Sequence, residues 1–116
     1  MSEDKKFVFD KRRFPRLTIN FDVQIYTVAK VLLGKGVTED ISASGMRIKS
    51  DIAQSLRNGL EVFITFSLPE GPVVDKIRGE IKGVVKSTSS QEIRLRFTEF
   101  KALDLLREYV EKKLNQ

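Results

Sequence analysis

The sequence predicts a mainly β protein, a six-stranded antiparallel β-barrel followed by one C-terminal α-helix. Three observations support this fold class. Apolar and polar residues alternate in several short segments, turn-forming residues separate those segments, and only the last segment changes to helical spacing. With 116 residues, the chain has the length of one domain with a single core. A small barrel covered by a helix fits this order of elements.

Six segments have the composition and alternation of half-buried strands. They are rich in Val, Ile, Phe and Thr, and turn residues such as Pro69-Glu70-Gly71-Pro72 lie between them. The polar residues 51–58 are expected to form a loop or one helical turn. The predicted strands are residues 20–28, 31–38, 46–49, 60–68, 74–87 and 92–98.

Glycines within two of these strands predict local features. Gly34 and Gly36 in the second strand indicate a bulge or a tight bend. In the fifth strand, small residues alternate with branched ones, which suits the narrow interior of a curled sheet. One face of the fifth strand is expected to carry Ile77, Gly79, Ile81, Gly83 and Val85.

The final segment has the spacing of an amphipathic helix. Leu103, Leu106, Val110 and Leu114 recur every three or four residues, which predicts a helix over residues 102–114. Lysines near its C-terminus complement the helix dipole.

The first 17 residues are interpreted as a flexible basic arm. Pro15 disfavours helical backbone in the residue before it. The predicted organisation is therefore an arm over residues 1–17, a barrel over 18–100 and a helix over 101–116 that packs on the barrel. The cations of the arm are Lys5, Lys6, Lys11, Arg12, Arg13 and Arg16.

The composition argues against most enzyme classes. The chain has no cysteine and no histidine, which removes disulfides, thiolate ligands, the commonest zinc ligand and the commonest general base. We therefore expect neither a catalytic site nor a metal site nor a resident cofactor. The net charge of +5 favours an anionic partner, although small domains commonly carry such a charge for solubility alone.

The hydropathy of the chain argues against a membrane span. No apolar run approaches the roughly 20 residues that cross a bilayer, and the N-terminal residues lack the apolar stretch of a signal peptide. We expect a soluble, cytoplasmic protein without membrane insertion.

Two short motifs carry the functional information. Arg12-Arg13-Phe14-Pro15-Arg16 is an RxxxR motif, and Asp40-Ile41-Ser42-Ala43-Ser44-Gly45 is a DxSxxG motif between the second and third predicted strands. Each has an ordinary explanation, since arginines form solvated clusters and Asp, Ser and Gly form turns. Together they resemble the signature of PilZ domains, bacterial receptors for the second messenger cyclic di-GMP (c-di-GMP). The resemblance extends over the whole chain and implies a barrel of Greek-key or split-barrel type.

The resemblance implies a ligand-binding role for Arg12, Arg16, Asp40, Ser42 and Gly45. A guanidinium can bond phosphate oxygens, or O6 and N7 of guanine, in pairs. A carboxylate at the Watson–Crick edge of guanine accepts from N1–H and the exocyclic amine, and adenine offers no such donor pair. The expected ligand is therefore c-di-GMP, with Asp40 selecting guanine.

The remaining motif positions have two interpretations each. Ser42 is expected either to bond the ligand or to satisfy the backbone of its own turn. Gly45 leaves space for the close approach of ligand or backbone. Lys11 and Arg13 are candidates for secondary ligand contacts or for solvated side chains. Many PilZ relatives have arginine at the position of Lys11, and this neighbour influences ligand number in the family, so one or two ligands remain open.

The resemblance implies a sensor whose arm orders over the barrel when ligand binds and relays the signal to an unidentified effector protein. One alternative is a small barrel that binds nucleic acid through the arm, Arg94 and Arg96, which the absence of tryptophan disfavours. Another is a PilZ-type adaptor that ignores the ligand, which the presence of both motifs disfavours. A homodimer through Phe7-Val8-Phe9 or the helix remains open, as does the process controlled, whether motility, exopolysaccharide, transcription or virulence.

Overall fold

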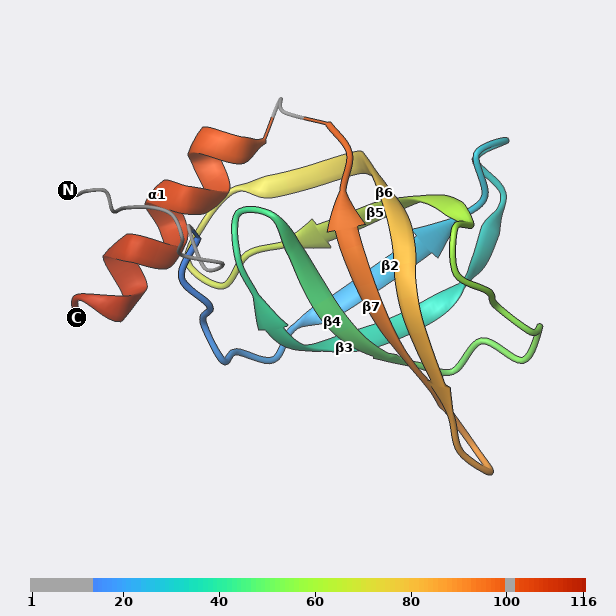
Figure 1. Cartoon of the computed structure of the whole chain (residues 1–116). Helices are drawn as coiled ribbons and strands as arrows, with labels where there is room; N and C mark the ends of the chain where they lie inside the picture. The colour runs from blue at the N-terminus through green and yellow to red at the C-terminus, as the bar shows by residue number, and fades with distance from the viewer. Residues whose placement is uncertain (1–13, 100–101) are drawn as a thin grey trace, which may run out of the picture.

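The computed structural model describes residues 14–99 and 102–116 and confirms the predicted fold class. Six antiparallel strands close into a barrel in the order β2-β3-β4-β7-β6-β5, and one helix, α1, follows (Figure 1). The elements are β2 Asp22–Tyr26, β3 Leu32–Ile41, β4 Gly45–Ser50, β5 Glu61–Ser67, β6 Val73–Lys86, β7 Gln91–Phe97 and α1 Leu103–Leu114.

Strand β3 is longer than predicted at the end that carries Asp40. It continues to Ile41, whereas the sequence pattern ends the strand at residue 38. The extension comes from pairing with β4, since Asp40 and Ile41 are opposite Arg47 and Met46. On its other side Ile41 pairs with Leu17 through two backbone hydrogen bonds of 2.8 and 2.9 Å. Asp40 therefore lies within a strand and not in the turn that follows it.

The barrel interior is filled by branched aliphatic side chains. Phe21 and Phe66 add an aromatic pair with ring centroids 5.4 Å apart. The polar segment 51–58 forms a loop without a helical turn, and the buried Gln91 holds it by donating to the carbonyl oxygens of Ile52 and Gln54 at 2.7 Å each. Fully buried aliphatic residues include Val23, Ile25, Ile41, Ile48, Val62, Ile64, Ile77, Ile81 and Ile93.

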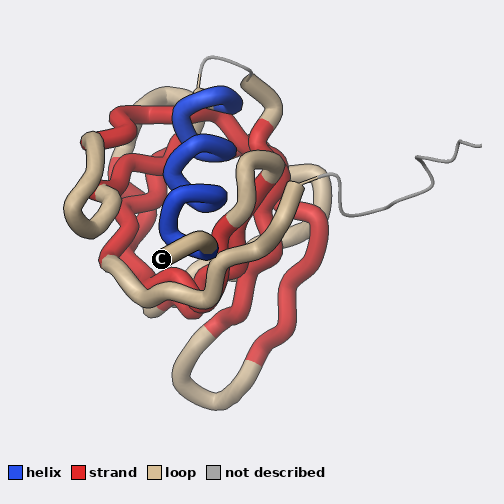
Figure 2. The backbone as a smooth tube through the Cα atoms, turned by 90° about the vertical axis from the view of Figure 1, so that its left-hand side faces the viewer, coloured by secondary structure: helices blue, strands red, loops and turns tan. Residues whose placement is uncertain are grey.

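Helix α1 lies across one end of the barrel (Figures 1 and 2), and the β3–β4 turn is found at the same end (Figure 1). It buries Leu106, Tyr109 and Val110. Tyr109 donates through its hydroxyl to the carbonyl oxygen of Pro69 at 2.7 Å. Leu114, which the helical spacing places on the inner face, is 46% exposed. No helix within the described residues is long and apolar enough to cross a membrane.

A β-bulge in β6 changes which side chains face the core. The pairing of β6 with β7 shifts between Ile81 and Gly83, so that Lys82 is an extra residue. An extra residue reverses the sides of the residues beyond it. The prediction that Gly83 and Val85 share the inner face of Ile81 is therefore wrong. Gly83 is buried, but it is paired with Arg94 and faces that side chain, and Val85 is 65% exposed.

Candidate functional site

The described parts of the two motifs meet beside the β3–β4 turn. Arg16 is positioned by its neighbour Leu17, whose backbone pairs with Ile41 at the end of β3. From there Nη1 of Arg16 donates to Oδ1 of Asp40 at 2.9 Å. Lys11, Arg12 and Arg13 lie outside the described residues, as does the Phe7-Val8-Phe9 segment, so the roles assigned to them remain predictions.

A second bulge directs Asp40 toward the outer surface. The pairing of β3 with β4 shifts between Thr38 and Asp40, which makes Glu39 the extra residue and places Asp40 opposite Arg47. Nη2 of Arg47 lies 3.0 Å from Oδ2 of Asp40. The Asp40 side chain is 11% exposed, so its two oxygens are each held by an arginine in a largely covered position.

Ser42 and Gly45 shape the turn itself. Oγ of Ser42 accepts from the backbone N–H of Ser44 at 3.2 Å and lies 3.0 Å from the Ser44 hydroxyl oxygen. The backbone N–H of Ser42 donates to the carbonyl oxygen of Gly45 at 2.9 Å. A Cβ on Gly45 would overlap the carbonyl oxygen of Leu95 in β7. Both residues therefore have a structural task here, and their ligand contacts remain a prediction.

The outer surface beside this turn carries a row of aligned residues across four strands. Asp40 on β3 is paired with Arg47 on β4, Arg47 with Arg94 on β7, and Arg94 with Gly83 on β6. A cavity of about 520 Å³ lies along this row. Its lining includes Arg16, Asp40, Ser42, Ser44, Gly45, Arg47, Lys82, Arg94 and Arg96.

The lining of this cavity is suited to an anion that also carries hydrogen-bond donors. Four arginines supply planar guanidinium groups, which bind phosphate in pairs of hydrogen bonds. Asp40 supplies a carboxylate that accepts hydrogen bonds. Within the described part of the chain, no group of three or more acidic side chains is arranged to hold a metal ion.

Two acidic side chains, Glu39 and Glu92, lie beside Arg47 at the edge of this row. Nε of Arg47 is 3.7 Å from Oε1 of Glu39 and 3.4 Å from Oε2 of Glu92. A hydrogen bond shared with the Glu92 carboxyl group raises the pKa of Glu39 above its ordinary value of 4.5. Burial and repulsion by Glu92 raise the pKa further, while Arg47 and Lys49 oppose the shift.

The raised pKa of Glu39 predicts a loss of stability as the pH increases. Above pH 4.5 and up to the raised pKa, the folded protein holds more protons on this carboxyl group than the unfolded chain, so stability falls with pH across this window. The Glu39→Gln variant lacks this titration. Between about pH 4 and about pH 7, the midpoint of thermal unfolding of the variant should increase relative to that of the wild type as the pH increases. If the wild-type midpoint increased relative to that of the variant instead, this electrostatic interpretation would be contradicted.

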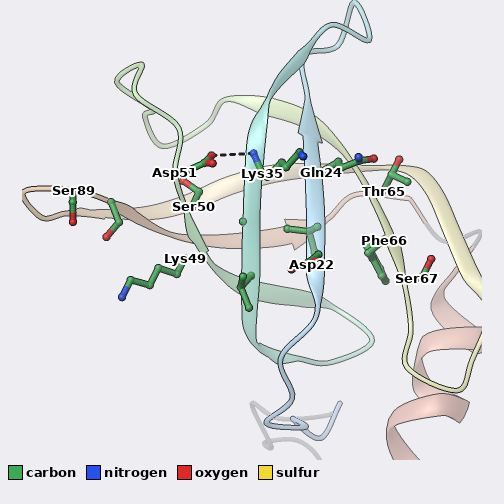
Figure 3. Close-up of a pocket in the computed structure, with 14 residues that line it drawn as sticks. Asp22, Gln24, Lys35, Lys49, Ser50, Asp51, Thr65, Phe66, Ser67 and Ser89 are labelled. Carbon is green, nitrogen blue, oxygen red and sulfur yellow. Dashed lines mark hydrogen bonds between the residues drawn. The ribbon is translucent and has the colours of Figure 1, made fainter.

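A larger hollow of about 840 Å³ lies on another part of the barrel, over β2, β3 and β5 (Figure 3). Its lining contains two positive side chains, Lys35 and Lys49, and two negative ones, Asp22 and Asp51, so their charges cancel. As Figure 3 shows, Asp51 accepts a hydrogen bond from the backbone N–H of Lys35, at 3.1 Å. Among the described residues that line it there is no arginine. The smaller cavity is therefore the better candidate for an anionic ligand.

The comparison with protein families decides the identity of the fold. The model described as PilZ domain matches residues 10–112, which is most of the chain. The chain belongs to the PilZ domain family. Both motifs, with Arg16 and Asp40 in contact, lie within the matched region of this PilZ domain.

Solved structures with similar folds include other PilZ proteins. The PilZ domain of YcgR from Escherichia coli, in a structure with c-di-GMP, is 14% identical, with a TM-score of 0.71 over 90% of this chain and 92% of that one. The inhibitor of motility MotI/DgrA of Bacillus subtilis is 21% identical, with a TM-score of 0.69 over 91% of this chain and 52% of that one.

A third similar structure is the MrkH–c-di-GMP complex of K. pneumonia, at 21% identity and a TM-score of 0.65 over 93% of this chain and 52% of that one. This PilZ domain thus spans about half the length of MotI/DgrA and of MrkH. At these identities the likeness shows the fold. No curated protein matches the sequence.

Proposed function

We propose that this PilZ domain is a receptor for c-di-GMP and that the ligand binds along the row formed by Asp40, Arg47 and Arg94. The observation that carries the proposal is the contact between Arg16 and Asp40, which joins two separate motifs beside a cavity lined by arginines. The YcgR and MrkH structures, which have the same fold and contain c-di-GMP, support it.

The proposed contacts follow from the chemistry of the ligand. Asp40 accepts hydrogen bonds from N1–H and the exocyclic amine of one guanine, which distinguishes guanine from adenine. An ionised carboxylate has about four lone-pair positions on its two oxygens, so Asp40 can accept from guanine while it keeps Arg47 as a partner. Arg16, whose side chain is 56% exposed, is free to turn from Asp40 to a phosphate.

Binding is proposed to act through the N-terminal arm. Arg12 lies four residues before Arg16 and would supply the second guanidinium of the RxxxR motif. Its engagement with the ligand orders the arm over the barrel, and the ordered arm forms a surface for a protein partner. This receptor requires no catalytic step, and a cytoplasmic location fits a receptor for an internal messenger. MotI/DgrA and MrkH are about twice as long as this chain, so each contains a further region beyond the PilZ fold. A protein partner or a larger assembly of this chain is therefore part of the proposal.

Titration calorimetry with c-di-GMP tests the proposal. The wild type should bind, and Arg16→Ala should weaken binding about 10- to 100-fold, because a hydrogen bond to a charged group contributes roughly 1.5–3 kcal/mol. Arg107→Ala is a matched control, since Arg107 lies on α1 and pairs with Asp104. The proposal fails if titration of the wild type with c-di-GMP at roughly tens of micromolar releases no heat. It also fails if Arg16→Ala binds c-di-GMP with the affinity of the wild type.

The nucleic-acid alternative receives less support. Stacking on bases requires open aromatic faces. Tyr26 and Phe63 lie on β2 and β5, across the barrel from the arginines of β7, and cations already lie over both rings. Nζ of Lys76 is 4.7 Å from the centre of the Tyr26 ring, and Cζ of Arg78 is 5.1 Å from that of Phe63.

A further inference from the structure

Arg94 differs from the other cations of the arginine-lined cavity. Arg16 and Arg47 both pair with Asp40. Arg96 pairs with Glu80 at 3.1 Å, and Lys82 lies 3.9 Å from the same carboxylate. Among the described residues, none forms an ion pair or a hydrogen bond with the guanidinium of Arg94. Its hydrogen-bond donors are therefore available without the loss of an existing ion pair.

The side chain of Arg94 is held in a space that glycine provides. A Cβ built on Gly83 would lie 2.7 Å from both Nε and Nη2 of Arg94 and 3.1 Å from Cζ. The guanidinium thus occupies the volume that any other residue at position 83 would fill. The bulge at Lys82 creates this arrangement, because it turns Gly83 to the side of the sheet on which Arg94 lies, where Gly83 is buried.

Arg94 also has an unfavourable neighbour. Its cross-strand partner on β4 is Arg47, and like charges directly opposite each other destabilise a sheet. Arg47 is compensated by Glu39, Asp40 and Glu92, and within residues 14–99 and 102–116 no acidic side chain forms an ion pair with Arg94. An anion between the two arginines would relieve this repulsion.

A second, smaller hollow of about 350 Å³ adjoins the first at Arg94. Arg47, Lys82 and Arg94 line both hollows, and the second continues over Gly83 and Val84. Arg94 therefore lies where the two hollows meet, within reach of a ligand that is larger than a single nucleotide.

We propose that Arg94, held over Gly83 and outside both motifs, binds a phosphate group of the cyclic dinucleotide whose guanine is held by Asp40. This assignment rests on the proposed c-di-GMP function. Gly83 acts as a positioning residue, because its missing side chain keeps the guanidinium of Arg94 in place.

Calorimetric titration of purified variants with c-di-GMP tests this role. Arg94→Ala should weaken binding about tenfold or more. The midpoint of thermal unfolding should stay unchanged or increase, because the repulsion from Arg47 is removed. Arg94→Lys should keep part of the affinity, since lysine binds phosphate as a point charge. Arg107→Ala again provides the control for a loss of positive charge.

A double-mutant cycle tests the link between the two residues. In Gly83→Ala the three atoms nearest the added methyl group belong to the flexible side chain of Arg94, so the variant should fold and yet bind about as weakly as Arg94→Ala. Adding Gly83→Ala to Arg94→Ala should then cause no further loss, because both changes remove the same contact.

Wild-type affinity in Arg94→Ala, a lowered unfolding midpoint in that variant, or additive losses in the double variant would overturn the role of Arg94. A loss in Arg94→Lys as large as in Arg94→Ala would overturn the phosphate contact. If the wild type bound but Arg94→Ala bound equally well, only this assignment would fail. If the wild type did not bind c-di-GMP, the proposed function would fail as well.

Discussion

Replacing Asp40 with alanine is expected to weaken the binding of c-di-GMP about 100-fold, because the donors of a guanine edge then lose two charge-assisted hydrogen bonds of roughly 1.5 kcal/mol each. The preference for guanine should fall with the affinity, since the carboxylate is the group that adenine cannot satisfy. The measurement is titration of c-di-GMP and cyclic di-AMP into the wild type and Asp40→Ala.

Asp22→Ala is the matched control for this experiment. Asp22 is an exposed aspartate on β2 that lines the larger hollow, so its replacement removes the same charge at the competing location. The control should bind as the wild type does. A loss of affinity in Asp22→Ala with full affinity in Asp40→Ala would move the site to the larger hollow.

Replacing Gly45 with alanine is expected to lower the midpoint of thermal unfolding by about 10 °C, one of the larger stability effects in this barrel. The new Cβ would overlap the carbonyl oxygen of Leu95, and this backbone group cannot move without disturbing the pairing of β4 with β7. Overpacking of this kind costs roughly 1–3 kcal/mol, and each kcal/mol lowers the midpoint of a domain of this size by about 4 °C or more.

The matched control is Gly83→Ala, in which the atoms nearest the added methyl group belong to the flexible side chain of Arg94. It should unfold close to the wild-type midpoint. If Gly45→Ala kept wild-type stability and lost only its affinity for c-di-GMP, the glycine would serve the ligand and not the sheet.

The fold could be predicted because alternation and helical spacing are local properties of the sequence. Phe21, Val23 and Ile25 show the strand period directly, and the order of turns and strands then favours a barrel. The inner face of α1 was harder to predict, because a leucine at helical spacing, Leu114, is exposed while Tyr109 is buried through its contact with Pro69.

The site was only partly predictable, because it depends on strand register. The order of the motifs indicates that Arg16 and Asp40 lie near one another. The two bulges beside the site, at Glu39 and Lys82, have no sequence signature, and they decide which side chains of the site face outward. Arg47 was missed for this reason. Its alternation between Met46 and Ile48 predicts an outward side chain, but only the pairing of β3 with β4 places it on Asp40.

The most direct test of the account is to follow the backbone amide signals of isotope-labelled protein by NMR while c-di-GMP is added. The account predicts that the largest shifts lie at Arg16, along the β3–β4 turn from Asp40 to Arg47, and at Gly83 and Arg94. Shifts confined to the larger hollow around Lys35, or no shifts at all, would contradict it.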